Sequence, residues 1–205
     1  MSNSGFSLIE LLVALAVSAI IITAAYLLFT SNQRIYAMQD EMISVQQTIR
    51  PAAEYMGRYI RLAGLDPERT GNFGFQNATN ATAIAFSFDE DHDGNLDANE
   101  QKSFRAQGNQ LQEFIMSSGT WEPIAENIEV LNFVYLDRDG FPTNTPAQIR
   151  TVQTSIVGRS RNSIIRYIDS STYRNLQGDI ILPPQNDNVM RLMFTETIQC
   201  RNIGM

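Results

Sequence analysis

The chain has 205 residues and a formal net charge of −7 at pH 7, and 43% of its residues are hydrophobic. This length suits one domain, or one domain with an extended element, and the apolar content is sufficient for a core. The acidic balance argues against nucleic-acid binding, which needs a basic face. Because Cys200 is the only cysteine, no intrachain disulfide can form, and a single histidine, His92, argues against a zinc site or histidine-based catalysis.

An uncharged apolar segment occupies the N-terminal region. Residues 11–29 contain no charge, and Ser18 and Thr23 are their polar interruptions. With residues 6–9 before it, this run is long enough for a helix across about 30 Å of hydrocarbon, where the backbone must satisfy its own hydrogen bonds. The alternative is a cleaved secretory signal, which would carry a basic segment before the apolar run and a small-residue cleavage site after it. Residues 1–5 contain no Lys or Arg.

Glu10 is the unusual residue of the apolar run. A charge in a membrane helix costs at least a few kcal/mol, so Glu10 is a functional candidate, the alternative being a carboxylate close enough to the headgroups to be tolerated. Residues 5–14 read GFSLIELLVA. This segment resembles the class III signal of type IV prepilins and pseudopilins, with Gly5 before the cleavage point, Phe6 after it and Glu10 at the fifth mature position.

The resemblance implies that a membrane prepilin peptidase cleaves the Gly5–Phe6 bond on the cytoplasmic side and methylates the new amine of Phe6. Gly5 has no side chain, which suits an extended segment in a protease cleft. Cleavage would create an ammonium group one helical turn from Glu10. In a filament core of low dielectric constant, a neighbour's ammonium can pair with that carboxylate, so Glu10 is expected to set the axial register of assembly.

The helical pattern continues beyond the apolar run. Apolar residues recur at intervals of three and four and so line one helical face: Ile35, Met38, Met42, Val45, Ile49, Ala53, Met56 and Ile60. Pro51 is a candidate kink, and Gly64 is a candidate stop. A helix from residue 6 to residue 63 would be on the order of 90 Å long. The helix-loosening proline of many major pilins is missing from residues 23–27, so the helix is expected to be continuous there.

The rest of the chain predicts β-structure. Alternating patterns indicate strands at residues 82–88, 103–106, 110–115, 128–136, 148–157 and 189–199, with a hairpin turn at 107–109 and an irregular region at 159–187. A long helix followed by antiparallel strands gives an α+β, pilin-like fold in which the amphipathic part of the helix packs on the sheet. The expected parts are a leader (1–5), a transmembrane or filament-core helix (6–30), its amphipathic continuation (31–63) and a β-rich domain (64–205).

The order of motifs in the β-rich region narrows the resemblance. An acidic Asp-Gly loop is followed by a hairpin, by residues 121–128 (WEPIAENI), by residues 133–140 (FVYLDRDG) and by a final strand that ends in Cys200-Arg201-Asn202. This order resembles PilW-type minor pilins and, more loosely, the J-type minor pseudopilins of type II secretion.

The acidic loop, residues 89–100, reads DEDHDGNLDANE. It meets the twelve-residue calcium-loop pattern, in which Gly94 permits the sharp turn and oxygen ligands come from Asp89, Asp91, Asp93, Asn95, Asp97 and Glu100. Because a strand precedes the loop, it would be a calcium site on a sheet rather than a paired EF-hand. The alternative is a solvated acidic turn.

Together these features predict a minor pilin that helps to initiate or cap a type IV pilus, and not an enzyme. The alternatives are a minor pseudopilin of a type II secretion or DNA-uptake system, and a calcium-dependent adhesin. The implied partners are other major and minor pilins through the N-terminal helix, the prepilin peptidase, the pilus assembly platform and the inner membrane. The expected location is the inner membrane, with a periplasmic C-terminal domain, and then the pilus surface.

Overall fold

The structure, a computed structural model, describes residues 7–77 and 79–203. Gly5 and Phe6, the predicted cleavage residues, lie outside the described residues. The chain forms two compact units, Met1–Asp40 and Glu41–Met205, and their boundary falls within one helix.

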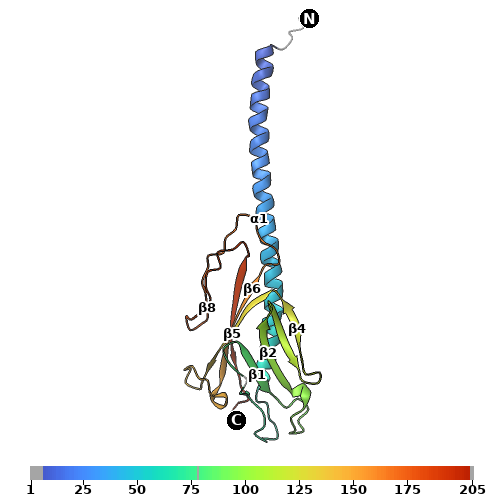
Figure 1. Cartoon of the computed structure of the whole chain (residues 1–205), viewed down its shortest axis with the longest axis vertical. Helices are drawn as coiled ribbons and strands as arrows, with labels where there is room; N and C mark the ends of the chain where they lie inside the picture. Colours follow the sequence, from blue (N-terminus) through green and yellow to red (C-terminus); the bar gives the residue numbers. More distant parts are fainter. Residues whose placement is uncertain (1–6, 78, 204–205) are drawn as a thin grey trace. The chain divides into compact units, whose positions relative to one another are not determined.

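That helix, α1, spans Leu8–Leu62 and continues through residues 23–27 and through Pro51 (Figure 1). It ends close to the predicted stop at Gly64. Gly64 has a φ of 74°, a conformation that glycine adopts without steric cost. The Gly64 N–H donates to the carbonyl of Ser87 at 2.9 Å, so the end of the helix is tied to a strand.

The strands form three antiparallel sheets instead of the single sheet that the sequence predicted. The four-stranded sheet has the order β1 (Ala83–Ser87), β2 (Gln101–Gln107), β3 (Gln110–Ile115), β4 (Thr120–Glu126). The three-stranded sheet has the order β5 (Ile128–Leu136), β6 (Thr151–Arg159), β9 (Arg191–Gln199). A small pair joins β7 (Tyr173–Arg174) to β8 (Ile180–Leu182), and two 3-10 turns cover Ala98–Glu100 and Pro146–Gln148.

The predicted hairpin and strands can be compared with the structure one by one. Gly108 and Asn109 both have positive φ and link β2 to β3 as a two-residue hairpin loop. The predicted strand at 128–136 coincides with β5. The strand predicted at 148–157 begins later, at Thr151, because Pro146 starts a 3-10 turn. Strand β4 was not predicted, and the region 159–187 contains the β7–β8 pair.

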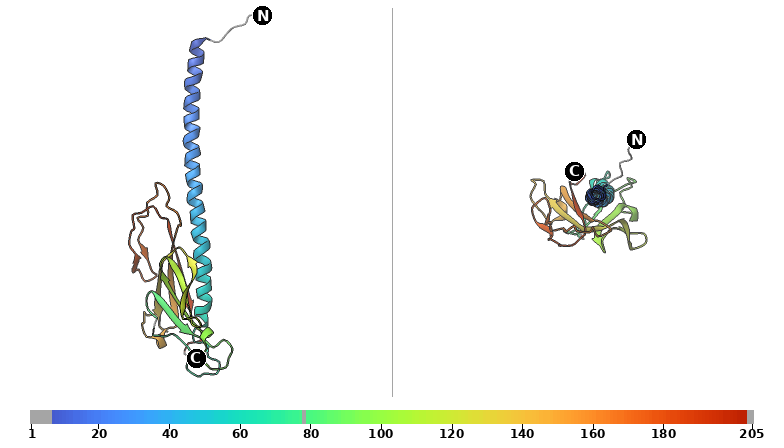
Figure 2. Two further views of the ribbon diagram at one scale, coloured as in Figure 1. Left: turned by 45° about the vertical axis from the view of Figure 1, so that its right-hand side comes forward. Right: turned by 90° about the horizontal axis from the view of Figure 1, so that it is seen from above.

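The apolar face of α1 packs against the sheets from Val45 onward. Val45, Ile49, Met56 and Ile60 are buried in one core with side chains of both larger sheets, whereas Met42 is still exposed. Figure 2 shows this part of the helix lying along the strands. The predicted packing of the helical stripe on the chain's own β-structure is confirmed for these residues.

A buried cation fastens the segment between β6 and β9. The guanidinium of Arg191, at the start of β9, is 2% exposed and contacts the carboxylates of Glu129, Asp187 and Asp169 at 2.7, 2.7 and 3.2 Å. Its hydrogen bond lowers the pKa of Asp187 to about 2. Arg191 and Asp169 are both buried, so removing either partner would leave the other charge buried without its counter-ion, which is costly.

We expect Gly158→Ala to destabilise the protein, because side chains of α1 pack tightly against β6 at Gly158. A Cβ at this position would lie 2.6 Å from Cγ1 of Ile49 and 3.2 Å from Val45. Overpacking of this kind costs about 1–3 kcal/mol. Gly57→Ala is the matched control, because its Cβ would meet the flexible carboxylate of Glu196 at 3.2 Å. Denaturant unfolding of the full chain in detergent should show a loss for Gly158→Ala alone; equal stability of the two variants would contradict this packing.

Candidate functional site

The first half of α1 presents apolar side chains on all sides. The large apolar residues between Leu8 and Phe29 are 50–75% exposed in the single chain. Among the described residues, α1 is the one helix long and apolar enough to cross a membrane, judged by length and composition. Such a surface is stable only against lipid or against other apolar helices.

Glu10 lies in the first turn of α1, where its carboxylate accepts the backbone N–H of Ser7 at 2.9 Å. The hydroxyl of Ser7 in turn accepts the N–H of Ile9 at 3.3 Å. Ser7 therefore caps the helix, and Glu10 reaches back to it in the manner of a capping box. This capping role was not predicted, although Ser followed three residues later by Glu is a sequence signal for it.

The acidic loop connects β1 to β2, and its two ends are buried. Asp89 is fully buried, and its carboxylate accepts the N–H groups of His92 at 2.6 Å and Gly94 at 3.2 Å. Gly94 has a φ of 72°, as the predicted sharp turn requires. His92 is exposed.

Three of the six predicted ligands come together. Carboxylate oxygens of Asp89, Asp91 and Asp93 lie within 4.8 Å of one another. Partial desolvation raises the pKa of Asp91, and the neighbouring carboxylates add to the rise. The side-chain amide and the N–H of Asn95 bond to Asp93 and lower the pKa of that carboxyl. This concentration of negative charge is what a hard cation would neutralise.

Glu100 is not a member of this cluster. The residue Glu100 is 1% exposed. Its carboxylate accepts the N–H of Glu90 at 2.7 Å and the N–H of Asp97 at 2.9 Å. The Glu100 side chain therefore closes the base of the loop through backbone hydrogen bonds. Asp97 is exposed at the start of the 3-10 turn and is likewise outside the cluster.

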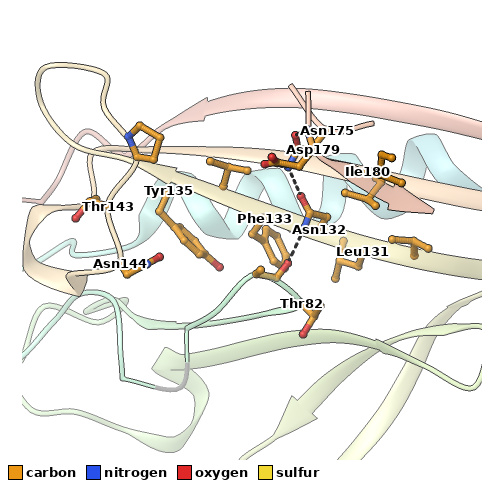
Figure 3. Close-up of a pocket in the computed structure, with 15 residues that line it drawn as sticks. Thr82, Leu131, Asn132, Phe133, Tyr135, Thr143, Asn144, Asn175, Asp179 and Ile180 are labelled. Atoms are coloured by element: carbon orange, nitrogen blue, oxygen red, sulfur yellow. Dashed lines mark hydrogen bonds between the residues drawn. The ribbon is translucent and has the colours of Figure 1, made fainter. Parts of the chain in front are cut away.

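A separate cavity of about 470 Å³ lies beside β5 (Figure 3). Asn132 stands at its centre, donating to the carbonyl of Ala81 at 3.2 Å and accepting from the amide of Asn175 at 3.2 Å. The Tyr135 hydroxyl donates to the carbonyls of Asn80 and Ala83. The bonds to residues 80–83 join β5 to the start of β1, and the bond to Asn175 joins β5 to the β7–β8 turn.

Comparison with known proteins now decides the family. Residues 1–26 match the prokaryotic N-terminal methylation motif, and residues 38–175 match the family described as prepilin peptidase-dependent protein B. The chain belongs to this prepilin peptidase-dependent protein B family. No curated protein matches the chain at a significant level.

The fold agrees with this family. A solved structure of a type IV-like pilin from Thermus thermophilus superposes with a TM-score of 0.51 at 10% identity, covering 82% of this chain and 98% of that one. The predicted α+β fold, a long N-terminal helix packed on antiparallel β-structure, is thus confirmed. The motif and the family together imply processing by a prepilin peptidase, as the sequence predicted.

Glu100→Ala should lower stability even without any cation, because the N–H groups of Glu90 and Asp97 would lose their acceptor. A hydrogen bond to a charged acceptor such as this carboxylate contributes about 1.5–3 kcal/mol. Glu100→Gln, which keeps a carbonyl oxygen, should lose less. The control is Glu90→Ala, an exposed change expected to stay within about 0.5 kcal/mol of wild type. Thermal unfolding in the presence of a chelator measures the stability of each variant. If Glu100→Ala were as stable as the control, Glu100 would not have this structural role.

Proposed function

We propose that the protein is a minor pilin of the PilW type, which helps to initiate or cap a type IV pilus. One observation carries the proposal. A chain of the prepilin peptidase-dependent family combines a methylation motif with an apolar helix that is exposed on all sides. A helix of that kind needs other apolar helices when it leaves the lipid. Its role is therefore assembly, and the acting surface is α1.

In this proposal residues 1–5 are the leader, 6–30 the transmembrane and filament-core helix, 31–63 its amphipathic continuation and 64–205 the periplasmic domain. The subunit waits in the inner membrane and then joins the pilus, in contact with other pilins and the assembly platform. A minor pseudopilin of a type II secretion or DNA-uptake system would use the same helix. The identity of the subunits that crosslink to α1 distinguishes the two.

Glu10 carries two possible roles that a substitution series separates. As a helix cap it needs an acceptor atom, which glutamine also provides. As a docking residue it needs a negative charge to meet the methylated ammonium of a neighbouring Phe6 in a medium of low dielectric constant. We propose that docking is the function and that the bond to Ser7 holds the carboxylate in place beforehand.

Glu10→Gln and Glu10→Ala should each reduce incorporation into the assembled complex by about tenfold or more, since the neighbour's ammonium would be buried without a partner. Ser7→Ala removes the hydroxyl cap but keeps the charge, and it should assemble nearly normally. Mass spectrometry should find a mature, methylated Phe6 in all three variants, which keeps processing apart from docking. Normal incorporation of Glu10→Gln would reduce Glu10 to a capping residue. An uncut chain would overturn the minor-pilin assignment.

We propose, as a second function, that the acidic loop binds calcium through Asp89, Asp91 and Asp93, with Asn95, Asp97 and Glu100 as the remaining positions of the pattern. The clustering of three carboxylates within 4.8 Å supports it. A site with a dissociation constant of roughly 10⁻⁴ to 10⁻³ M would suffice where calcium is millimolar. Such an ion would stiffen the end of the domain as part of the pilus or as part of an adhesive surface.

Millimolar calcium should raise the melting temperature of the full chain in detergent, and magnesium should raise it less. For a dissociation constant of roughly 10⁻⁴ to 10⁻³ M, the gain at 1 mM calcium is about 0.4 to 1.4 kcal/mol. Asp91→Asn and Asp93→Asn should remove the calcium effect, and Glu90→Gln should keep it. Glu100 is unsuitable for this test because its carboxylate holds the loop by itself. An unchanged melting temperature, together with no heat of binding in calorimetry, would leave the loop as an acidic turn.

A further inference from the structure

Three of the four edges of the two larger sheets are protected. The outer edge of β1 is covered by residues 74–76, which exchange hydrogen bonds with Ala85 and Ser87. The outer edge of β5 bonds to Ala81 and Thr143. Strand β4 carries Pro123 and pairs with β3 through a β-bulge. Covering, proline and bulges are the devices by which proteins prevent edge-to-edge pairing.

The fourth edge, the free side of β9, has no such device. Its register with β6 has no shift. At one end of this pairing the N–H of Ser160 donates to the carbonyl of Met190, and at the other end the N–H of Cys200 donates to the carbonyl of Arg150. Even-numbered residues of β9 therefore bond to β6, and odd-numbered residues direct their N–H and C=O groups outward. The hydroxyl of Tyr173 donates to the outward carbonyl of Arg191, in agreement with this parity.

The outward backbone groups of Met193, Thr195, Thr197 and Gln199 have no hydrogen-bond partner among residues 7–77 and 79–203. We call these four residues the β9 edge. Their side chains are uncharged, and Met193, Thr197 and Gln199 are exposed. Between Arg191 and Gln199 the strand has neither lysine nor proline, and its β-branched threonines favour cross-strand pairing.

The direction of β9 limits what can pair with it. Gly158, opposite Leu192, touches Ile49 of α1, whereas Cys200 beyond the end of β9 contacts the carbonyl of Ile60. Strand β9 thus runs in the same sense as the 49–60 part of α1. Antiparallel pairing of β9 with β9 of a second copy would set those two helices in opposite senses. Copies anchored by the same N-terminal span emerge from the membrane in one sense, so this homodimer does not fit.

We propose that the β9 edge accepts an extended strand from a different membrane-anchored subunit of the same assembly, running antiparallel to β9. This inference rests on the proposed minor-pilin function. An antiparallel pair satisfies the outward groups with straight hydrogen bonds. The pairing can be weak by itself, because subunits anchored in one membrane meet at a high effective concentration. The β9 edge thereby gives the globular domain a second, sequence-tolerant contact beside the helix.

Photo-crosslinking of the full chain in cells that make the whole assembly tests this proposal. The probe is p-benzoylphenylalanine, placed at Thr197 on the β9 edge, at Ser118 in the exposed β3–β4 turn, or at Ile22 in the apolar helix. We expect the probe at Thr197 to give an adduct that maps to a strand of another subunit. Ser118 should give none, and Ile22 should report helix assembly in every background.

Variants at Thr195 decide whether backbone pairing is responsible. Thr195→Pro removes an N–H that has no acceptor within the described part of the chain, and Thr195→Lys places a charge on the edge. Both should lower the yield of the Thr197 adduct about tenfold. Thr195→Ala, which keeps the N–H, should leave the yield unchanged. Should Thr195→Pro fail to fold, Thr195→Lys answers the question alone.

The possible results separate the two proposals. Loss of the Thr197 adduct in the Pro and Lys variants, with the Ile22 adduct retained, supports the β9 edge as the docking strand. Persistence of the Thr197 adduct in those variants, its mapping to a second copy of this chain, or its absence while Ile22 still crosslinks would overturn the edge proposal alone. Absence of both adducts would reject the minor-pilin function and this inference with it.

Discussion

The burial of one face of α1 against the sheets is the contact on which the rest of the domain depends. Val45, Ile49, Met56 and Ile60 form one core with side chains of both larger sheets. Gly158 lets β6 come close enough for this contact, and the end of the helix is tied to β1 through Gly64. Because the residues that the structure describes form no ladder of hydrogen bonds between the two larger sheets, this shared core and the polar contacts beside β5 hold them together.

The two parts of α1 have different surfaces. From Leu8 to Phe29 it is apolar around its whole circumference, and from Val45 it is apolar on one face alone. A helix buried on one face is stabilised by its own domain, whereas a helix apolar on every face needs lipid or other helices. This division agrees with the family comparison, because the match to the methylation motif, residues 1–26, covers most of the fully apolar part of the helix.

Buried carboxylates in this acidic chain are held by defined donors. Glu100 accepts two backbone N–H groups, Glu113 contacts Lys102 at 2.5 Å and Tyr55 at 2.7 Å, and Asp169 contacts Arg191. Asp91 and Asp93, by contrast, are exposed and repel each other at the tip of the acidic loop. The contrast separates carboxylates that stabilise the fold from those available to a cation.

Sequence alone determined the features that depend on local pattern. The apolar run, the GFSLIE motif, the stripe of α1, the Gly108–Asn109 hairpin and β5 follow from composition, periodicity and turn chemistry, which act over a few residues. Tertiary structure decided what depends on distant partners. The division into separate sheets arises from contacts between residues far apart in the chain, which no local pattern encodes. The open edge of β9 belongs to the same class, because an edge exists only once every other strand has found its neighbour.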